Sequence, residues 1–511
     1  MEDKKARMKR IVIRRHPLAA AAAQLAALML AVQLHSTTNV AAASLSAEAR
    51  SPSPFSTEPE QIKPPNVALP SIGRLAVRHA REIASSTWSI GGETLDRDFT
   101  VYENYKAHVG PLGAKGIRLQ AGWAKCEKAP GVYDWAWLDA IVNDALAQGV
   151  QPWLETSYGN ILYAGGGGTG LGGGFPKSSE ALAAWDNWVR ALVRHFKDRV
   201  REWEIWNEPD LSKANTSEEY TALFIRTARA IRAEQPGARI YALALAHRLP
   251  FAEEFLRRLH EARQADLMDA VTFHGYPHNP DNTYEADALR ALLKQYAPHA
   301  HVRQGETGTP SKWQPNYALS NKPWSENTQA KWDLRRMLAH HAKEVPMSLF
   351  TIMDMHYLRD GRVDMNWKGV LAANPDKTVA YRKPSYLAAQ RVFSIFDDTL
   401  ERARDVTLTS STTEKLAAAA WRHRQSGGVV AAVWQNGAPP RDANDTTPTD
   451  LTFAGVTFAE PVLADLLTGA VFAIPADRWS AALNGTKFRK LPLYDSPVLI
   501  AEKPALRMQD K

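Results

Sequence analysis

Between residues 88 and 353, short apolar runs alternate with longer segments in which the apolar residues recur at a helical spacing. Runs of this kind are typical of parallel strands that are buried on both faces. They cover residues 88–92, 116–120, 150–155, 200–206, 240–246, 270–274, 301–305 and 347–353. Eight strands that alternate with helices predict a (β/α)₈ TIM barrel. A doubly wound open sheet is the alternative, but no Gly-rich nucleotide-binding motif opens the first unit.

The helical segments have readable apolar stripes. One stripe consists of Leu182, Trp185, Trp188, Val189, Leu192, Val193 and Phe196, and a second of Tyr220, Leu223, Phe224, Thr227, Ala228 and Ile231. Ser178 or Ser179 and Thr216 or Ser217 are the candidate N-caps. Both helices fall between predicted strands, as a barrel requires.

After a last helix over 386–396, the sequence changes to short strand-like pieces separated by Gly, Pro, Asn and Asp. They lie at 406–408, 416–421, 429–434, 451–453, 462–466 and 498–501. This pattern predicts a small β-sandwich domain over 398–511, after a barrel over 69–397. We also expect strand-like sequence at 75–79 to pair with it.

The start of the chain has the three-part layout of a signal peptide. Basic residues precede an apolar run over 18–34, and a small-residue stretch follows at 41–44. We assign 1–43 to the signal peptide and the Ser/Pro-rich residues 44–68 to a linker. The expected location is periplasmic or secreted, without stable membrane association after cleavage. A retained membrane anchor is the alternative.

Charge and cysteine content exclude two classes of function. The formal net charge is +7, but seven basic and two acidic residues precede residue 44, so the rest of the chain is close to neutral. No basic stripe is left to bind nucleic acid. The single cysteine, Cys126, cannot form an intramolecular disulfide and offers no cysteine-based metal site.

Two glutamates end predicted strands. Glu208 follows the fourth strand within Trp206-Asn207-Glu208-Pro209, and Glu306 follows the seventh within Gly305-Glu306-Thr307-Gly308. In a parallel barrel, both positions lie at the mouth where the loops converge. Hydrolysis of a glycoside needs one protonated carboxylic acid and one ionised carboxylate, with pKa values that are pushed apart. Glu204 is the rival of Glu208, but it lies deeper in the strand and is interpreted as a hydrogen-bonded barrel residue.

Trp206-Asn207-Glu208-Pro209 at the end of a fourth strand resembles the acid/base signature of glycoside hydrolase clan A, the 4/7 superfamily. The trailing β-domain and Lys383-Pro384-Ser385-Tyr386 before the last helix are most similar to family 39, which contains xylosidases and iduronidases. The segment around Glu306 also resembles family 5. The resemblance to clan A covers the chain after the linker.

The resemblance implies a role for each matching residue. Glu208 would be the acid/base and Glu306 the nucleophile of a retaining reaction. Arg118 would brace the nucleophile, and Asn207 would contact the sugar 2-hydroxyl. His274 and Tyr276 match the aromatic pair that ends the sixth strand, where a tyrosine typically hydrogen-bonds the nucleophile.

Other residues near strand ends are candidate substrate contacts on weaker grounds. They are Glu93, Asp96, Trp123, Tyr158, Asn160, His247 and Trp313. Glu93 and Asp96 could hold sugar hydroxyls or serve as loop and cap residues, and Trp313 could form a sugar platform or pack internally. The glycine-rich segment 165–174 is interpreted as a lid, because it lacks the P-loop spacing.

The predicted function is that of a retaining glycoside hydrolase that cleaves O-glycosidic bonds of a poly- or oligosaccharide without a cofactor or metal. Two alternatives are a non-catalytic carbohydrate-binding barrel and a transglycosylase of the same clan. A third, a metal enzyme using Glu204, Glu208 and His274, lacks the usual cluster of ligands.

Overall fold

Eight parallel strands close into a barrel in the order β10-β11-β2-β3-β6-β7-β8-β9. The structure is a computed structural model and describes residues 55–509. The barrel strands are β2 (Trp88–Gly91), β3 (Gly116–Gln120), β6 (Gln151–Thr156), β7 (Glu202–Ile205), β8 (Arg239–Leu245), β9 (Ala270–His274), β10 (His301–Thr307) and β11 (Met347–Leu349). Each overlaps one predicted strand, so the predicted barrel is confirmed. The predicted signal peptide lies outside the described residues.

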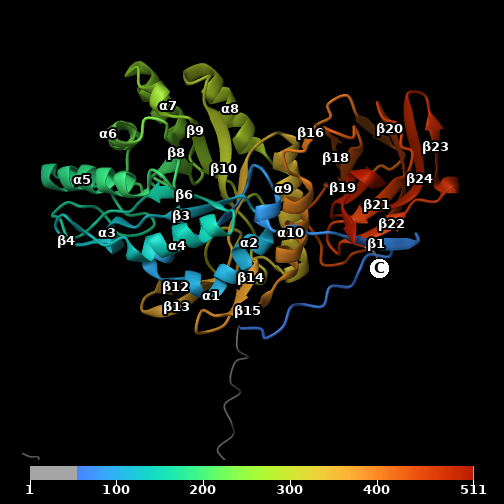
Figure 1. Ribbon diagram of the computed structural model, residues 1–511, viewed down its shortest axis with the longest axis horizontal. Coiled ribbons are helices and arrows are strands. Elements are labelled where there is room, and N and C mark those ends of the chain that lie inside the picture. Colours follow the sequence, from blue (N-terminus) through green and yellow to red (C-terminus); the bar gives the residue numbers. More distant parts are fainter. Residues whose placement is uncertain (1–54, 510–511) are drawn as a thin grey trace, which may run out of the picture. The chain divides into compact units, whose positions relative to one another are not determined.

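Helices follow the barrel strands and surround them (Figure 1). The longer ones are α4 (Ala136–Ala147), α5 (Ser179–Phe196), α6 (Ser217–Glu234), α7 (Leu249–Glu261), α8 (Tyr284–Tyr296), α9 (Glu326–Ala342) and α10 (Pro384–Ile395), and the short ones are α1 (Tyr102–Tyr105), α2 (Val109–Leu112) and α3 (Trp123–Cys126). The stripes predicted for α5 and α6 are buried except for Leu182, which is half-buried. Ser178 and Thr216 cap the two helices by accepting backbone hydrogen bonds from Ala181 and Glu219.

Three hairpins extend from the barrel. They are β4–β5 (Glu127–Ala129 and Val132–Tyr133), β12–β13 (Met355–Arg359 and Arg362–Asn366) and β14–β15 (Leu371–Ala373 and Val379–Arg382). The β12–β13 hairpin follows the eighth barrel strand, so it stands on the mouth side of the barrel. The sequence patterns did not predict it.

The C-terminal domain consists of two antiparallel sheets. The larger sheet has the order β16-β18-β19-β25-β21-β22-β1-β26, and the smaller has the order β17-β20-β24-β23. The strands are β16 (Leu400–Arg402), β17 (Thr407–Ser410), β18 (Leu416–His423), β19 (Val429–Gln435), β20 (Thr447–Ala454), β21 (Pro461–Asp465), β22 (Ala470–Ala473), β23 (Trp479–Ala482), β24 (Gly485–Leu493), β25 (Val498–Glu502) and β26 (Met508–Gln509). The predicted β-domain after the barrel is confirmed.

One strand of the larger sheet comes from the N-terminal side of the barrel. Strand β1 (Ser71–Leu75) pairs antiparallel with β22 and with β26, and Figure 1 shows it in blue beside the red C-terminal strands. The C-terminal domain is therefore built from two separate parts of the chain. Of the stretch expected at 75–79, only Leu75 lies in this strand.

Residues 55–68, which were assigned to the linker, run along the folded part without forming a helix or strand. The Glu60 carboxylate accepts hydrogen bonds from the backbone N–H groups of Glu326 (2.8 Å) and Asn327 (3.4 Å) in the first turn of α9. The Phe55 ring stacks on His356. This segment is attached by contacts that Ser and Pro content alone does not predict.

Barrel and β-domain share one hydrophobic core. The Trp421 ring of β18 stacks on His341 of α9 and meets Phe396 edge-on. Among residues 55–509, no helix combines the length and apolar character needed to cross a membrane.

Candidate active site

Glu208 lies just beyond the end of β7, the fourth barrel strand. Trp206 and Glu208 adopt left-handed backbone conformations, with φ of 65° and 47°, which non-glycine residues adopt rarely. The Glu208 N–H donates to the carbonyl of Ala244 on the neighbouring strand at 3.1 Å. This bond fixes the backbone that carries the carboxylate.

Glu306 lies in β10, the seventh barrel strand. The Tyr276 hydroxyl donates a hydrogen bond to its Oε1. Its Oε2 lies 3.4 Å from a terminal guanidinium nitrogen of Arg118 and 3.4 Å from Nδ1 of His274. Both carboxylate oxygens are therefore held by side chains from other barrel strands or the loops after them.

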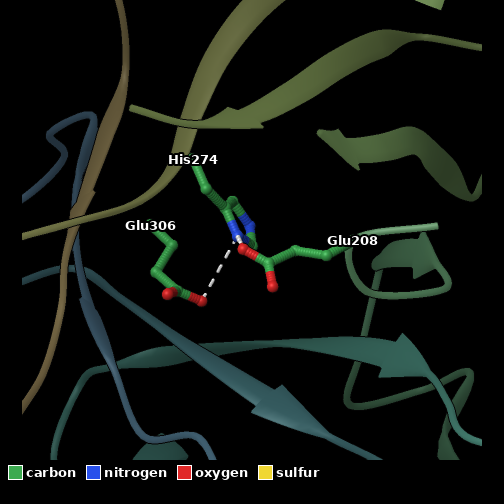
Figure 2. A group of neighbouring side chains, drawn as sticks. All are labelled: Glu208, His274 and Glu306. Carbon is green, nitrogen blue, oxygen red and sulfur yellow. Dashed lines mark hydrogen bonds and ion pairs between the residues drawn. The ribbon is translucent and has the colours of Figure 1, made fainter. Parts of the chain in front are cut away.

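The two carboxylates face each other across His274 (Figure 2). His274 Nδ1 shares a 2.9 Å hydrogen bond with Oε1 of Glu208. One oxygen of each carboxylate and one nitrogen of His274 all lie within 4.8 Å of one another. The side chains of Glu208 and Glu306 are 11% and 13% exposed, so both carboxylates remain accessible to a ligand.

A cavity of about 760 Å³ opens above this pair. Its lining includes Leu171 from the glycine-rich segment, His247, Tyr276, Tyr317, Phe350, Tyr357, Asn366 and Lys368. Apolar and aromatic walls around a few convergent polar groups are typical of a small-molecule site.

Arg118 lies beneath the pair and is fully buried. Its partners are Glu204 at 2.6 Å, Asn207 at 2.9 Å, Glu93 at 3.0 Å, Glu306 at 3.4 Å, and Glu155. One guanidinium thus serves four carboxyl groups. Because burial disfavours the charged form, the pKa values of Glu93 and Glu155 are raised.

The environment of Glu208 favours its protonated form. Burial, followed by the negative charge of nearby Asp210, raises the pKa of Glu208 to about 8. Asp210 is fixed by backbone N–H groups of Ala246, His247 and Arg248, at 2.8 to 3.0 Å. At neutral pH Glu208 therefore carries a proton that it can donate.

The other titratable groups of the cavity are also shifted by burial. Burial lowers the pKa of His274 to about 4, so the imidazole is neutral at pH 7. It lowers the pKa of the Lys368 ammonium to about 7, against the opposing effect of Glu306 and Glu208. Such perturbed groups gathered in one cavity are typical of an active site.

The structure brings the predicted Glu208, Glu306, Arg118, His274 and Tyr276 together. Asn207 joins them, because its amide oxygen accepts from Arg118 and its amide nitrogen donates to the Tyr158 hydroxyl at 2.9 Å. His247 lines the cavity from the end of β8.

The weaker candidates are distributed differently. Asp96, Tyr158 and Asn160 line a second hollow, of about 490 Å³, beside the glycine-rich segment. Glu93 is buried, is paired with Arg118 and does not line the cavity. Glu204 is also buried, bonded to Arg118 and Thr272, as the barrel interpretation expected.

Two tryptophan candidates line neither hollow. Trp123 is fully buried, stacks on Tyr163 and Trp188, and donates to Glu127 at 2.5 Å, so it does not face a ligand. Trp313 is 59% exposed but lines neither hollow. Its position at a strand end did not determine the direction of its ring.

Sequence reasoning missed Lys368, Tyr357 and Asn366, which line the cavity. All three belong to the β12–β13 hairpin or the turn after it, and that hairpin has no counterpart in the predicted strands. The only sequence signal was an aromatic and charged stretch, 356–368, directly after the eighth strand.

The three donors of Glu208, His274 and Glu306 are close enough together to hold a metal ion. The metal alternative named Glu204 instead of Glu306, but Glu204 is occupied by Arg118 and Thr272. The Arg118 guanidinium beside Glu306 opposes the approach of a cation. The residues present thus fit a carboxylate pair better than a metal centre.

A parallel barrel whose fourth and seventh strands present facing glutamates defines the class of the clan A glycosidases. The family model described as glycosyl hydrolases family 39 matches residues 123–435. The chain belongs to glycoside hydrolase family 39, and it is a glycosidase.

Solved structures share the fold. A family 39 glycoside hydrolase from Bacteroides cellulosilyticus WH2 superposes with a TM-score of 0.59 at 17% identity, over 82% of this chain and 81% of that one. The family 39 enzyme from Xanthomonas axonopodis pv. citri gives 0.54 at 18%, over 85% and 98%. A monomeric β-xylosidase from Caulobacter crescentus CB15 gives 0.53 at 17%, over 84% and 97%. No curated protein sequence matches the chain.

Proposed function

We propose that the protein hydrolyses O-glycosidic bonds of a poly- or oligosaccharide with retention of anomeric configuration, using Glu306 as nucleophile and Glu208 as acid/base. The observation that carries this proposal is the closeness of the two carboxylates. One carboxylate oxygen of Glu208 lies within 4.8 Å of one carboxylate oxygen of Glu306. Retaining pairs are separated by about 5 to 5.5 Å, whereas inverting pairs need roughly 6.5 to 9.5 Å to admit a water molecule.

In the first step, Glu208 donates its proton to the glycosidic oxygen while a Glu306 oxygen attacks the anomeric carbon. The bond between that carbon and the leaving oxygen breaks, and a glycosyl ester on Glu306 forms. The raised pKa of Glu208 supports its role as acid. Arg118 and Tyr276 support Glu306 as the nucleophile, because each contacts one of its carboxylate oxygens and so orients the carboxylate.

In the second step, water attacks the anomeric carbon and the bond to Glu306 breaks. Glu208, now ionised, accepts the proton of that water. Esterification of Glu306 removes a negative charge close to Glu208, which favours the ionised form that this step needs. The two carboxylates return to their starting protonation states.

The proposal is tested with a panel of aryl glycosides of xylose, arabinose, galactose and uronic acids, and with polysaccharides, on wild type and Glu306→Ala. Xylosides come first because one fold relative is described as a β-xylosidase. We expect the wild type to cleave at least one substrate and Glu306→Ala to lose that activity. Failure of the wild type on every substrate would overturn the proposal.

We also propose that the enzyme is exported. Support comes from the basic, apolar and small-residue order of residues 1–43. The measurement is the N-terminal sequence of the protein recovered from the producing cells. A new N-terminus near residue 44 is expected, and an intact Met1 would contradict the proposal.

A further inference from the structure

The loop over 275–283, between β9 and α8, forms one wall of the catalytic cavity. It carries Tyr276, whose hydroxyl is bonded to Glu306, and its Pro277, His278, Asn279 and Asn282 line the cavity. Loops of this kind tolerate movement unless other elements hold them. The position of the wall therefore depends on what contacts its outer side.

Helix α9 holds the main chain of this loop from the barrel side. The Trp332 indole N–H lies 3.2 Å from the carbonyls of Pro277 and His278. Arg336, which is fully buried, donates to the carbonyls of Gly275 (3.3 Å) and Pro280 (3.2 Å). These bonds fix both ends of the segment that carries Tyr276.

The β-domain holds the same loop from the other side. The Trp434 indole N–H at the end of β19 donates to Oδ1 of Asp281 at 2.8 Å. The Asn279 amide donates to the carbonyl of Asn436 at 3.1 Å. The two bonds tie Asn279 and Asp281 of the loop to a strand end of the other domain.

Arg335 of α9 joins the two sides. It is fully buried and bonded to Asp281, to Oδ1 of Asn279 (3.1 Å) and to the carbonyl of Ala438 in the β-domain (2.9 Å). The Asp281 side chain is only 9% exposed, so it is shielded from competing water. Hydrogen bonds to a charged group in such surroundings are stronger than bonds between neutral groups.

The β-domain segment that makes these contacts is itself anchored. Lys331 of α9 donates to the carbonyls of Arg441 (2.8 Å) and Ala443 (2.7 Å) and to Asp495 (2.7 Å). Lys331 thus holds the end of the segment 434–443, and the pairing of β19 with β18 holds its beginning at Trp434. It can serve as a fixed support for the loop.

We propose that the β-domain is a working part of the catalytic apparatus, with Trp434 and Asp281 as positioning residues for the cavity wall that carries Tyr276. This proposal rests on the proposed function of the cavity. The residues act through the loop and do not touch the substrate. Support of a binding wall by buried hydrogen bonds from an outer layer is a general requirement for precise sites.

The test compares Trp434→Phe with Trp421→Phe. Both are buried indoles of the same sheet, but Trp421 packs on His341 and Phe396 and not on the loop. Trp434→Phe removes the indole N–H together with part of the ring volume and should lower kcat/KM about 10-fold, in kcat as well as KM, because the loop carries Tyr276. Trp421→Phe should stay within about 2-fold, at a comparable loss of Tm. Equal effects of the two variants would overturn the proposal.

A second pair of variants, at Asp281, makes the test independent of whether the Trp434→Phe variant folds. Asp281→Asn retains an acceptor for the Trp434 N–H, whereas Asp281→Ala removes it, so the alanine variant should be the weaker enzyme. Identical kcat/KM for the two would contradict a positioning role.

Amide hydrogen exchange of 275–283 supplies a readout that does not need turnover. We expect faster exchange in Trp434→Phe than in Trp421→Phe or wild type, because the loop loses its support. Unchanged exchange would overturn the positioning claim even if the enzyme is active. An inactive wild type with the expected exchange pattern would instead refute the proposed function alone.

Discussion

The Tyr276 hydroxyl donates a hydrogen bond to Oε1 of Glu306, while Oε2 of the same carboxylate faces Arg118. Burial, followed by the negative charge of Glu306, raises the pKa of Tyr276, so the phenol keeps its proton and remains a donor. The nucleophile proposed here is thus oriented by a neutral donor on one oxygen and a cation on the other.

Tyr276→Phe should lower kcat on the order of 10- to 100-fold, because a hydrogen bond to a charged group contributes about 1.5 to 3 kcal/mol. The measurement is kcat and KM on a substrate that the wild type cleaves. Tyr102→Phe is the matched control. The Tyr102 hydroxyl donates a 2.8 Å hydrogen bond to Asp144, and neither residue lines the cavity. Equal kcat values for the two variants would argue against the role of Tyr276.

The value of kcat/KM should fall as pH rises through about 8. Glu208 must be protonated to act as acid, and burial and Asp210 raise its pKa to about 8 in the free enzyme. The group therefore supports activity below that pH and loses its proton above it. A profile that stays flat to pH 9.5 on a substrate with a poor leaving group would contradict this assignment.

Glu208→Ala should spare aryl glycosides with good leaving groups more than those with poor ones. Only a poor leaving group needs the proton of Glu208 to depart. The measurement is the ratio of kcat/KM values for wild type and variant across leaving groups of different pKa. Equal loss on all of them would speak against the acid role.

The barrel and the facing carboxylates were predictable because each depends on local sequence. The eight apolar runs and the two glutamates at strand ends follow from periodicity and strand order. The direction of a side chain in a loop does not, which is why Trp123 and Trp313 were assigned to a substrate site that neither lines. Lys368 was missed because an unpredicted hairpin carries it there.

Tertiary contacts account for the remaining differences. Strand β1 joins a sheet whose other strands begin more than 300 residues later, which local pattern cannot reveal. Residues 55–68 have the composition of a linker, yet Glu60 meets the first turn of α9. Both features depend on partners that are distant in the sequence.

Arg118→Met should lower the free energy of unfolding by about 3 to 5 kcal/mol, since it leaves several buried carboxyl groups without a cation. Denaturant unfolding with activity assays is the measurement. Arg226→Met removes a guanidinium that pairs with Asp186 at the surface and should change stability by less than about 1 kcal/mol. Similar losses for the two variants would contradict the central role of Arg118.

Glu60→Ala should destabilise the protein by about 1 kcal/mol, because the first turn of α9 loses its acceptor. Thermal or denaturant unfolding of the variant measures the effect. Glu58→Ala removes a carboxylate two residues earlier and is the control. Unchanged stability of Glu60→Ala would show that residues 55–68 contribute nothing through this contact.

The anomeric configuration of the first sugar released tests the central claim most directly. It is read by proton NMR within the first minutes of cleavage of whichever glycoside the wild type accepts, before mutarotation equilibrates the product. Double displacement on Glu306 predicts a product with the configuration of the substrate. Release of the opposite anomer would contradict the assignment of Glu306 as nucleophile.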